Sequence, residues 1–217
     1  MLLIRNFVAL TAVLVAGSLA LPGVTLADDA ARGQALYDLC AQCHGSNAGG
    51  MELSLAPAIA GLDAWYVESQ LKMFRSGARG LHPDDVGGMR MSPMSRWLRS
   101  DADITAVATY VASLPPVAPT PVVHGGDAEA GKTFYQTCLA CHGAEAQGNQ
   151  AMNAPPLRNM SDWYLVGALE KYKAGVRGSD PANTNAVLMR GMSNILPNDQ
   201  AIKDVVAYLD TLATPAR

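Results

Sequence analysis

The sequence has no surplus of positive charge, no second long apolar run and no stretch in which apolar and polar residues alternate. Its 217 residues include 16 lysines and arginines against 19 aspartates and glutamates, for a formal net charge of −3. A nucleic-acid-binding surface is therefore not expected. No apolar stretch after the first 27 residues approaches the roughly 20 residues of a membrane-spanning helix. The missing alternation disfavours β-strands and predicts an all-α protein.

The first 27 residues differ from the rest of the chain. Arg5 is their only charge, and residues 7–21 form an apolar run. The small residues Thr25 and Ala27 then precede a possible cleavage site. This order is typical of a cleaved secretory signal peptide. An uncleaved membrane anchor is the alternative, but the apolar run is short for it. We expect residues 1–27 to be removed on export to the periplasm.

Shifting the chain against itself by 98 residues reveals a tandem duplication. From Asp29 to Leu114, 28 of 86 positions are identical to the residue 98 positions later, without an insertion. Unrelated sequences would give about a fifth of that number. We therefore expect two domains. The predicted boundaries are 28–114 for the first domain, 115–126 for a linker and 127–217 for the second domain.

The composition of the linker and the apolar spacing within each copy support this division. Residues 115–126 include four prolines and end in two glycines, which predicts a semi-extended connection. Apolar residues recur at helical spacing within each copy, so three main helices are expected per copy. The middle helices should end at Gly77 and Gly175. Ser100 and Asn198 are the expected N-caps of the last helices.

Each copy contains one C-x-x-C-H segment, which is the attachment signature of c-type haem. Two residues between the cysteines let both sulfurs reach the two vinyl groups along one haem edge. The adjacent histidine then lies under the iron. The predicted cofactors are two covalently bound haem c groups. The predicted attachment residues are Cys40, Cys43, Cys138 and Cys141, and the predicted proximal iron ligands are His44 and His142.

Alternative roles for the cysteine pairs fit the sequence less well. A redox C-x-x-C of the thioredoxin type expects a βαβ context. A four-cysteine zinc site usually places its pairs 15–20 residues apart, whereas 94 residues separate Cys43 from Cys138. A plain disulfide leaves the histidine in both copies unexplained.

The duplication narrows the choice of a sixth iron ligand, which is usually methionine or histidine. Of ten methionines, only two pairs are methionine in both copies. His82 and His124 have no histidine counterpart, so surface positions are expected for them. The residues alone leave both methionine pairs open: Met91 with Met189, and Met94 with Met192.

With these features the sequence resembles the class I cytochromes c and, as a pair of domains, the dihaem cytochrome c4 family. The resemblance extends over nearly all of the chain after residue 27. It rests on the C-x-x-C-H segments, on Ala56-Pro57, on the Phe74–Arg79 run and on the methionine segment before the last helix. It implies two tandem class I cytochrome c domains, each with three main helices around one haem.

The resemblance also implies roles for particular residues. In the family the ligating methionine lies seven residues before a leucine, which selects Met91 and Met189 and leaves Met94 and Met192 as packing residues or alternatives. One residue is inserted after that leucine in each copy, so the register is open. The resemblance further implies that the carbonyls of Pro57 and Pro155 accept hydrogen bonds from the proximal histidines. It implies that Arg79 and Arg177 pair with haem propionates. The repeated aromatic residues would pack near the propionates or in an ordinary core; they are Trp65, Tyr66, Trp163 and Tyr164.

The function implied is electron transport between redox proteins. The expected protein is a periplasmic carrier, not an enzyme, that is reduced by a quinol-oxidising membrane complex and delivers electrons to a terminal oxidase or reductase. Its contact with the membrane would be at most peripheral. One alternative is a dedicated cytochrome subunit of a dehydrogenase. A dihaem peroxidase is a second alternative, but it needs an iron without a fixed sixth ligand, which a methionine in both copies disfavours.

Overall fold

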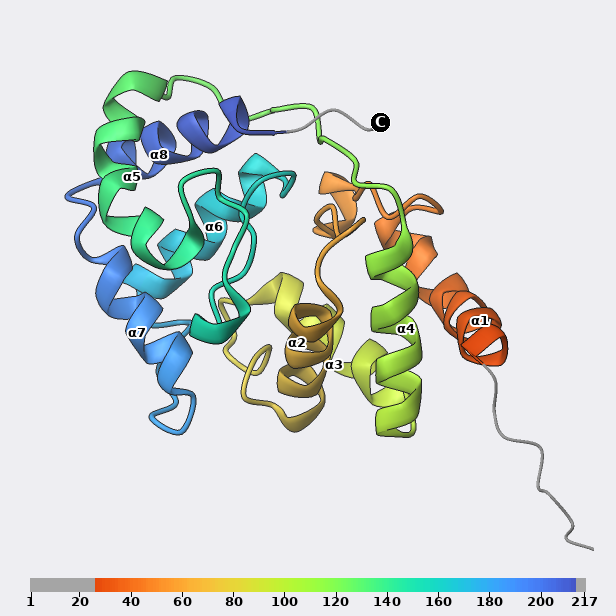
Figure 1. Ribbon diagram of the computed structural model, residues 1–217. Coiled ribbons are helices and arrows are strands. Elements are labelled where there is room, and N and C mark those ends of the chain that lie inside the picture. The colour runs from red at the N-terminus through yellow and green to blue at the C-terminus, as the bar shows by residue number, and fades with distance from the viewer. Residues whose placement is uncertain (1–25, 214–217) are drawn as a thin grey trace, which may run out of the picture.

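The computed structural model describes residues 26–213, which form two helical halves joined by an extended segment (Figure 1). The predicted signal peptide falls almost entirely on residues 1–25 and so lies outside the described range. Within that range no helix is long and apolar enough to cross a membrane. The helices of the first half are α1 (Leu26–His44), α2 (Ala64–Ser76), α3 (Val86–Trp97) and α4 (Asp101–Ser113), and those of the second are α5 (Ala128–His142), α6 (Asp162–Lys173), α7 (Thr184–Ser193) and α8 (Asp199–Thr211).

The three helices predicted in each half are present, and the described chain contains no strand. Each half also has a fourth helix, α3 or α7, in the segment that carries the methionines. Apolar spacing gave no sign of α3, because its sequence contains two glycines and Pro93, which weaken intrinsic helix propensity. The helix begins nevertheless, since the Asp85 side chain accepts a hydrogen bond from the backbone N–H of Gly88.

The first and last helices of each half cross at a glycine. A Cβ atom at Gly33 of α1 would overlap the Ala106 carbonyl of α4, and one at Gly131 of α5 would overlap the Asp204 carbonyl of α8. The absence of a side chain therefore lets the backbones meet. Tyr37 packs beside this crossing in the first half, and its ring lies 5.4 Å from that of a tyrosine of α4.

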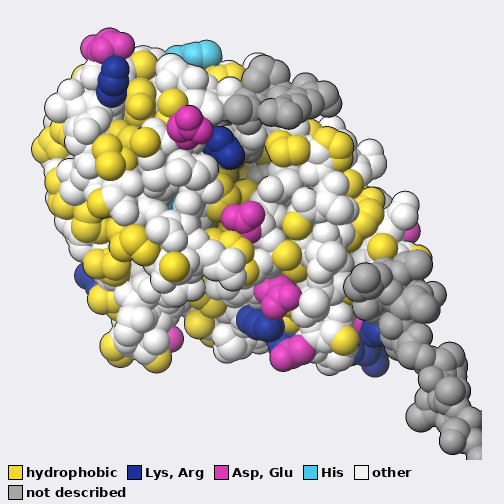
Figure 2. Space-filling model, viewed as in Figure 1, with side chains coloured by type: hydrophobic (Ala, Val, Ile, Leu, Met, Phe, Trp, Pro, Cys, Tyr) yellow, Lys and Arg dark blue, Asp and Glu magenta, His cyan; other side chains and the backbone are white. Residues whose placement is uncertain are grey.

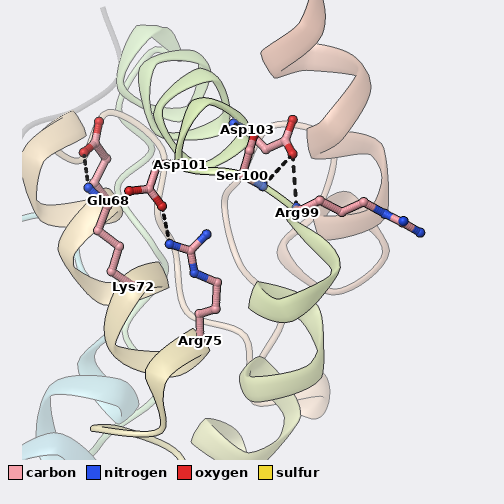
Figure 3. A network of polar contacts seen from close by, with 7 residues as sticks. All are labelled: Glu68, Lys72, Arg75, Arg99, Ser100, Asp101 and Asp103. Carbon is pink, nitrogen blue, oxygen red and sulfur yellow. Dashed lines mark hydrogen bonds and ion pairs between the residues drawn. The ribbon is translucent and has the colours of Figure 1, made fainter.

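A capping box fixes the start of α4 (Figure 3). The Ser100 hydroxyl accepts a hydrogen bond from the Asp103 backbone N–H, and the Asp103 carboxylate accepts one from the Ser100 N–H at 3.0 Å. Arg75 of α2 forms an ion pair with Asp101 in the first turn. The reciprocal cap satisfies backbone N–H groups that a helix start leaves unpaired, so Ser100 caps the helix as the sequence predicts.

The C-terminal part of the segment 115–126 lies against the second half. Asp162, which is 1% exposed, accepts hydrogen bonds from the backbone N–H groups of Val122 and Val123 through one carboxylate oxygen and of Trp163 through the other. Val117 packs against the hydrophobic core. The segment has no regular secondary structure, as its prolines predict, but it is not a free tether.

The glycine crossing predicts that Gly131→Ala destabilises the haem-loaded protein. The added methyl group would meet backbone that cannot rotate away, so a loss of about 1–3 kcal/mol is expected from overpacking. Gly191→Ala is the matched control, because Gly191 lies in α7 with open space at its Cβ position. That change should stabilise the protein by about 0.5–1 kcal/mol. Denaturant unfolding measures both, and equal effects would contradict the crossing.

The partial burial of Asp210 predicts that the stability of the protein depends on pH. Burial, with a smaller contribution from the Asp162 charge, raises the pKa of Asp210 to about 6. The folded state then binds more protons than the unfolded state between about pH 4 and pH 6, so this term reduces stability as the pH rises. Asp210→Asn should add about 1 kcal/mol at pH 7, after solvent screening, and almost nothing below pH 4. Equal gains at both pH values in thermal unfolding would contradict this assignment.

Candidate functional site

The two C-x-x-C-H segments lie at the C-terminal ends of α1 and α5, where each histidine is buried. His44 is 6% exposed and His142 is 5% exposed. The Nδ1 atom of His44 lies 2.9 Å from the Pro57 carbonyl oxygen, and that of His142 lies 2.8 Å from the Pro155 carbonyl oxygen. Burial lowers the pKa of both rings despite these bonds. A neutral ring that donates from Nδ1 keeps the lone pair of Nε2 free for a metal.

The backbone turns away immediately after each histidine. Gly45 has φ 80° and Gly143 has φ 83°, a region that disfavours residues with a side chain. The Tyr37 hydroxyl donates a 2.8 Å hydrogen bond to the Gly45 carbonyl, and Tyr135 makes the same bond to Gly143 at 2.7 Å. These bonds anchor the end of each motif to the helix that carries it.

The four cysteines, all within the described residues, form no disulfide. Burial raises the pKa of the Cys40 thiol to about 11 and also raises that of Cys138. Both cysteines of the second half, Cys138 and Cys141, line the same cavity as His142. The two thiols of the second half therefore lie at the cavity that His142 lines, where thioether bonds to a haem would form.

A cavity lies beside each buried histidine and reaches the methionine-bearing helix. The first, of about 280 Å³, is lined by His44 and by Met91 of α3. The second, of about 230 Å³, is lined by His142 and by two methionines of α7, Met189 and Met192. Met94 does not line the first cavity and is 40% exposed. The geometry therefore favours Met91 over Met94 in the first half.

Each cavity is completed by residues of the other half. Trp163 and Tyr164 of α6 line the first cavity, and Trp65 of α2 lines the second. The backbone N–H of Ala58 donates a hydrogen bond to the hydroxyl of Ser161 in the second half. The aromatic pairs of the repeat therefore form walls between the two cavities rather than an isolated core in each half.

Positive charge is concentrated where the cavities approach each other. Arg79 lines both cavities and donates a 3.0 Å hydrogen bond to the Tyr164 hydroxyl, while its buried Nε has no partner. Arg177 also lines both cavities. Burial alone would raise the pKa of Tyr164, but the two guanidinium groups outweigh burial and lower it. Two half-buried guanidinium groups, one of them with an unpaired buried donor, fit an acidic partner, and haem propionates have that chemistry.

Two further contacts join the halves, and they involve positions that are equivalent in the repeat. The carboxylate of Asp85, 2% exposed, lies 2.7 Å from Nζ of Lys171. Burial would raise the pKa of Asp85, but Lys171 and Arg79 lower it. The residues 98 positions away are Asn183 and Met73, and the Asn183 amide lies 3.0 Å from the Met73 sulfur. One version is an ion pair, and the other is neutral.

Asp85 and Lys171 could not be recognised as site residues from identity between the two copies, because both positions differ between them. His82 and His124, expected at the surface, line neither cavity. What marks Asp85 and Lys171 in the sequence is a difference between the copies, not an identity. Each is a charged residue in one copy against a neutral residue in the other, and Asp85 lies close to the methionine segment.

The comparisons with known proteins agree with this geometry. The family model "Cytochrome c" matches residues 30–115 and 128–213. "Thiosulfate dehydrogenase electron acceptor" of Stutzerimonas stutzeri is 32% identical, over 78% of this chain and 76% of that protein. "Cytochrome c-552" of Acidithiobacillus ferridurans is 30% identical, over 96% of this chain and 88% of that protein. A solved cytochrome c4 of Acidithiobacillus ferrooxidans has a TM-score of 0.66 at 28% identity and covers 81% of this chain and 99% of that one.

The chain belongs to the cytochrome c family. Its two family domains carry two c-type haems, and it is an electron-carrying dihaem cytochrome similar to cytochrome c4. The described residues fit that cofactor. Each cavity is lined by a neutral histidine, by a methionine thioether and by the guanidinium groups of Arg79 and Arg177, which can bind carboxylates. The expected two tandem domains are confirmed.

The positions of the methionines predict which substitutions open an iron. Met91→Ala and Met189→Ala should each remove the methionine–iron charge-transfer band from one haem, and the potential of that haem should fall, because a stronger donor or water stabilises Fe(III). Met94→Ala should keep the band and change stability by less than about 1 kcal/mol, since Met94 is exposed. Absorption spectroscopy of the oxidised protein and redox titration measure these effects.

Met192→Ala is the second half's control. It should keep the band but reduce stability by about 1–2 kcal/mol, because its partly buried side chain lines the cavity. Loss of the band in Met192→Ala, with retention in Met189→Ala, would move the ligand by three residues in the second half.

Proposed function

We propose that the protein is a periplasmic carrier that takes electrons from a quinol-oxidising complex and delivers them to a terminal oxidase or reductase, and that it is not itself an enzyme. The observation that carries this proposal is the presence, in the lining of each cavity, of a buried histidine together with a methionine of α3 or α7. Two protein ligands leave no iron position for a substrate. Bound haem supplies an iron that alternates between Fe(II) and Fe(III).

The residues of the chain have distinct roles in this proposal. Cys40, Cys43, Cys138 and Cys141 hold the cofactors covalently, and His44 and His142 are the proximal ligands. The carbonyl of Pro57 orients the His44 ring and increases its donor strength through the 2.9 Å bond. Pro155 acts in the same way on the His142 ring. Met91 and Met189 would each supply the second protein ligand to an iron and would favour its reduced state, since a thioether is a weak donor.

Arg79 and Arg177 bind the acidic groups of the cofactors in this proposal. Both line the two cavities, and the unpartnered Nε of Arg79 leaves a donor for such a group. Arginine suits this role, because its planar guanidinium stays charged and binds carboxylates with two donors.

The partners are redox proteins, and one observation favours a lasting complex with one of them. Large apolar side chains are exposed in two segments that contribute Leu55 and Gly87 to the lining of the first cavity: Leu53 is 94% exposed, and Met51, Leu55, Val86 and Met89 are each at least 40% exposed. Figure 2 shows hydrophobic side chains spread over the viewed face, with acidic and basic side chains scattered among them. A permanent partner would cover such a surface. The second candidate function is therefore a dedicated cytochrome subunit of a dehydrogenase, and the relative named as an electron acceptor of thiosulfate dehydrogenase supports it.

Spectropotentiometric titration of the purified mature protein tests the proposal. The titration should show two one-electron waves. The mass of the protein should exceed that of the polypeptide by two haems, and carbon monoxide or cyanide should not bind rapidly at either iron. Fast, tight binding at one haem would favour the peroxidase alternative. Extraction of haem by acid–acetone would contradict covalent attachment. Co-purification with one dehydrogenase at fixed stoichiometry would favour the subunit over the free carrier.

A further inference from the structure

The linings of the two cavities differ in charge although the cavities lie in repeat-related halves of the chain. Lys171 lines the first cavity only, whereas its partner Asp85 lines both. In the repeat-related position the second cavity is lined by the neutral residues Met73 and Asn183. The first cavity therefore faces a carboxylate together with its cation. The second faces the same carboxylate without that cation.

We propose that the Asp85–Lys171 ion pair makes the two haem sites unequal and biases the electron toward the haem of the first half. This inference rests on the proposed function, since it needs both haems in the cavities. A haem gains one negative charge on reduction, so a nearby carboxylate disfavours the reduced state and a nearby ammonium favours it. At the first site the two charges offset each other. At the second site the carboxylate dominates and lowers the potential.

Burial strengthens the effect of the Asp85 and Lys171 charges on the haem potentials. Asp85 is 2% exposed and its partner's side chain is 32% exposed, so solvent screens the carboxylate weakly. By contrast, Glu68 and Lys72 of α2 form an ion pair at 3.2 Å that is more exposed, and neither residue lines a cavity. The two pairs differ in location and burial rather than in chemistry.

The single substitutions separate electrostatics from structure. Asp85→Asn keeps a similar shape and removes the negative charge, so both potentials should rise. Lys171→Met introduces the residue that the repeat has at the equivalent place and leaves the carboxylate uncompensated. Both potentials should then fall, and that of the first haem more. Each change breaks the same contact between the halves, so a purely structural role would shift the potentials in the same direction in both variants.

The double variant Asp85→Asn with Lys171→Met tests the bias itself. It makes the Asp85–Lys171 contact neutral, as the Asn183–Met73 contact already is. The electron distribution between the two haems should change by about tenfold toward the second, which for a one-electron couple corresponds to about 59 mV. The control Glu68→Gln with Lys72→Met should change the distribution by less than about twofold.

Redox titration of the dihaem proteins gives both potentials, and the Met91→Ala and Met189→Ala variants assign them to the halves. Shifts of opposite sign in the single variants, together with the change in the double variant, would support the inference. Shifts of the same sign, or a double variant that behaves like the Glu68 and Lys72 control, would overturn it. In those cases two haems with closed coordination would leave the proposed function intact. Loss of a haem or an open iron in the unsubstituted protein would instead contradict the proposed function.

Discussion

The contact on which each half depends is the close approach of its first and last helices at a glycine. At Gly33 and Gly131 backbone meets backbone, which fixes the helix that ends in the C-x-x-C-H segment. The turn at Gly45 or Gly143 then directs the chain to the proline carbonyl that orients the histidine. The position of the buried histidine is thus set by packing some three helical turns away.

The sequence predicted most of what the duplication preserves. The bonds from the histidines to Pro57 and Pro155 are present as the resemblance to the cytochromes c implies. The end of α2 at Gly77 and the caps at Ser100 and Asn198 are present as the residues themselves predict. Each of these depends on a residue type with a specific local geometry, such as a hydroxyl at a helix start. Local geometry of this kind can be recognised without knowledge of the fold.

The remaining features depend on how the halves meet, which no local pattern encodes. The helical state of the segment around Pro93 follows from a cap by Asp85 and from packing, against its intrinsic propensity. The joint construction of the cavities by Trp65 and Trp163 follows from the orientation of one half on the other. Because the two sides of this contact face different neighbours, residue identity between the copies is a poor guide there.

The bonds from Asp162 to the segment before α5 have a consequence for how the chain can be divided. A fragment that begins at residue 127 would lack the backbone N–H groups of Val122 and Val123 and would leave a buried carboxylate short of two donors. A fragment that begins a few residues earlier would retain them. The structural unit of the second half therefore starts within the proline-rich segment, and the length of that segment cannot be altered on its C-terminal side as if it were a spacer.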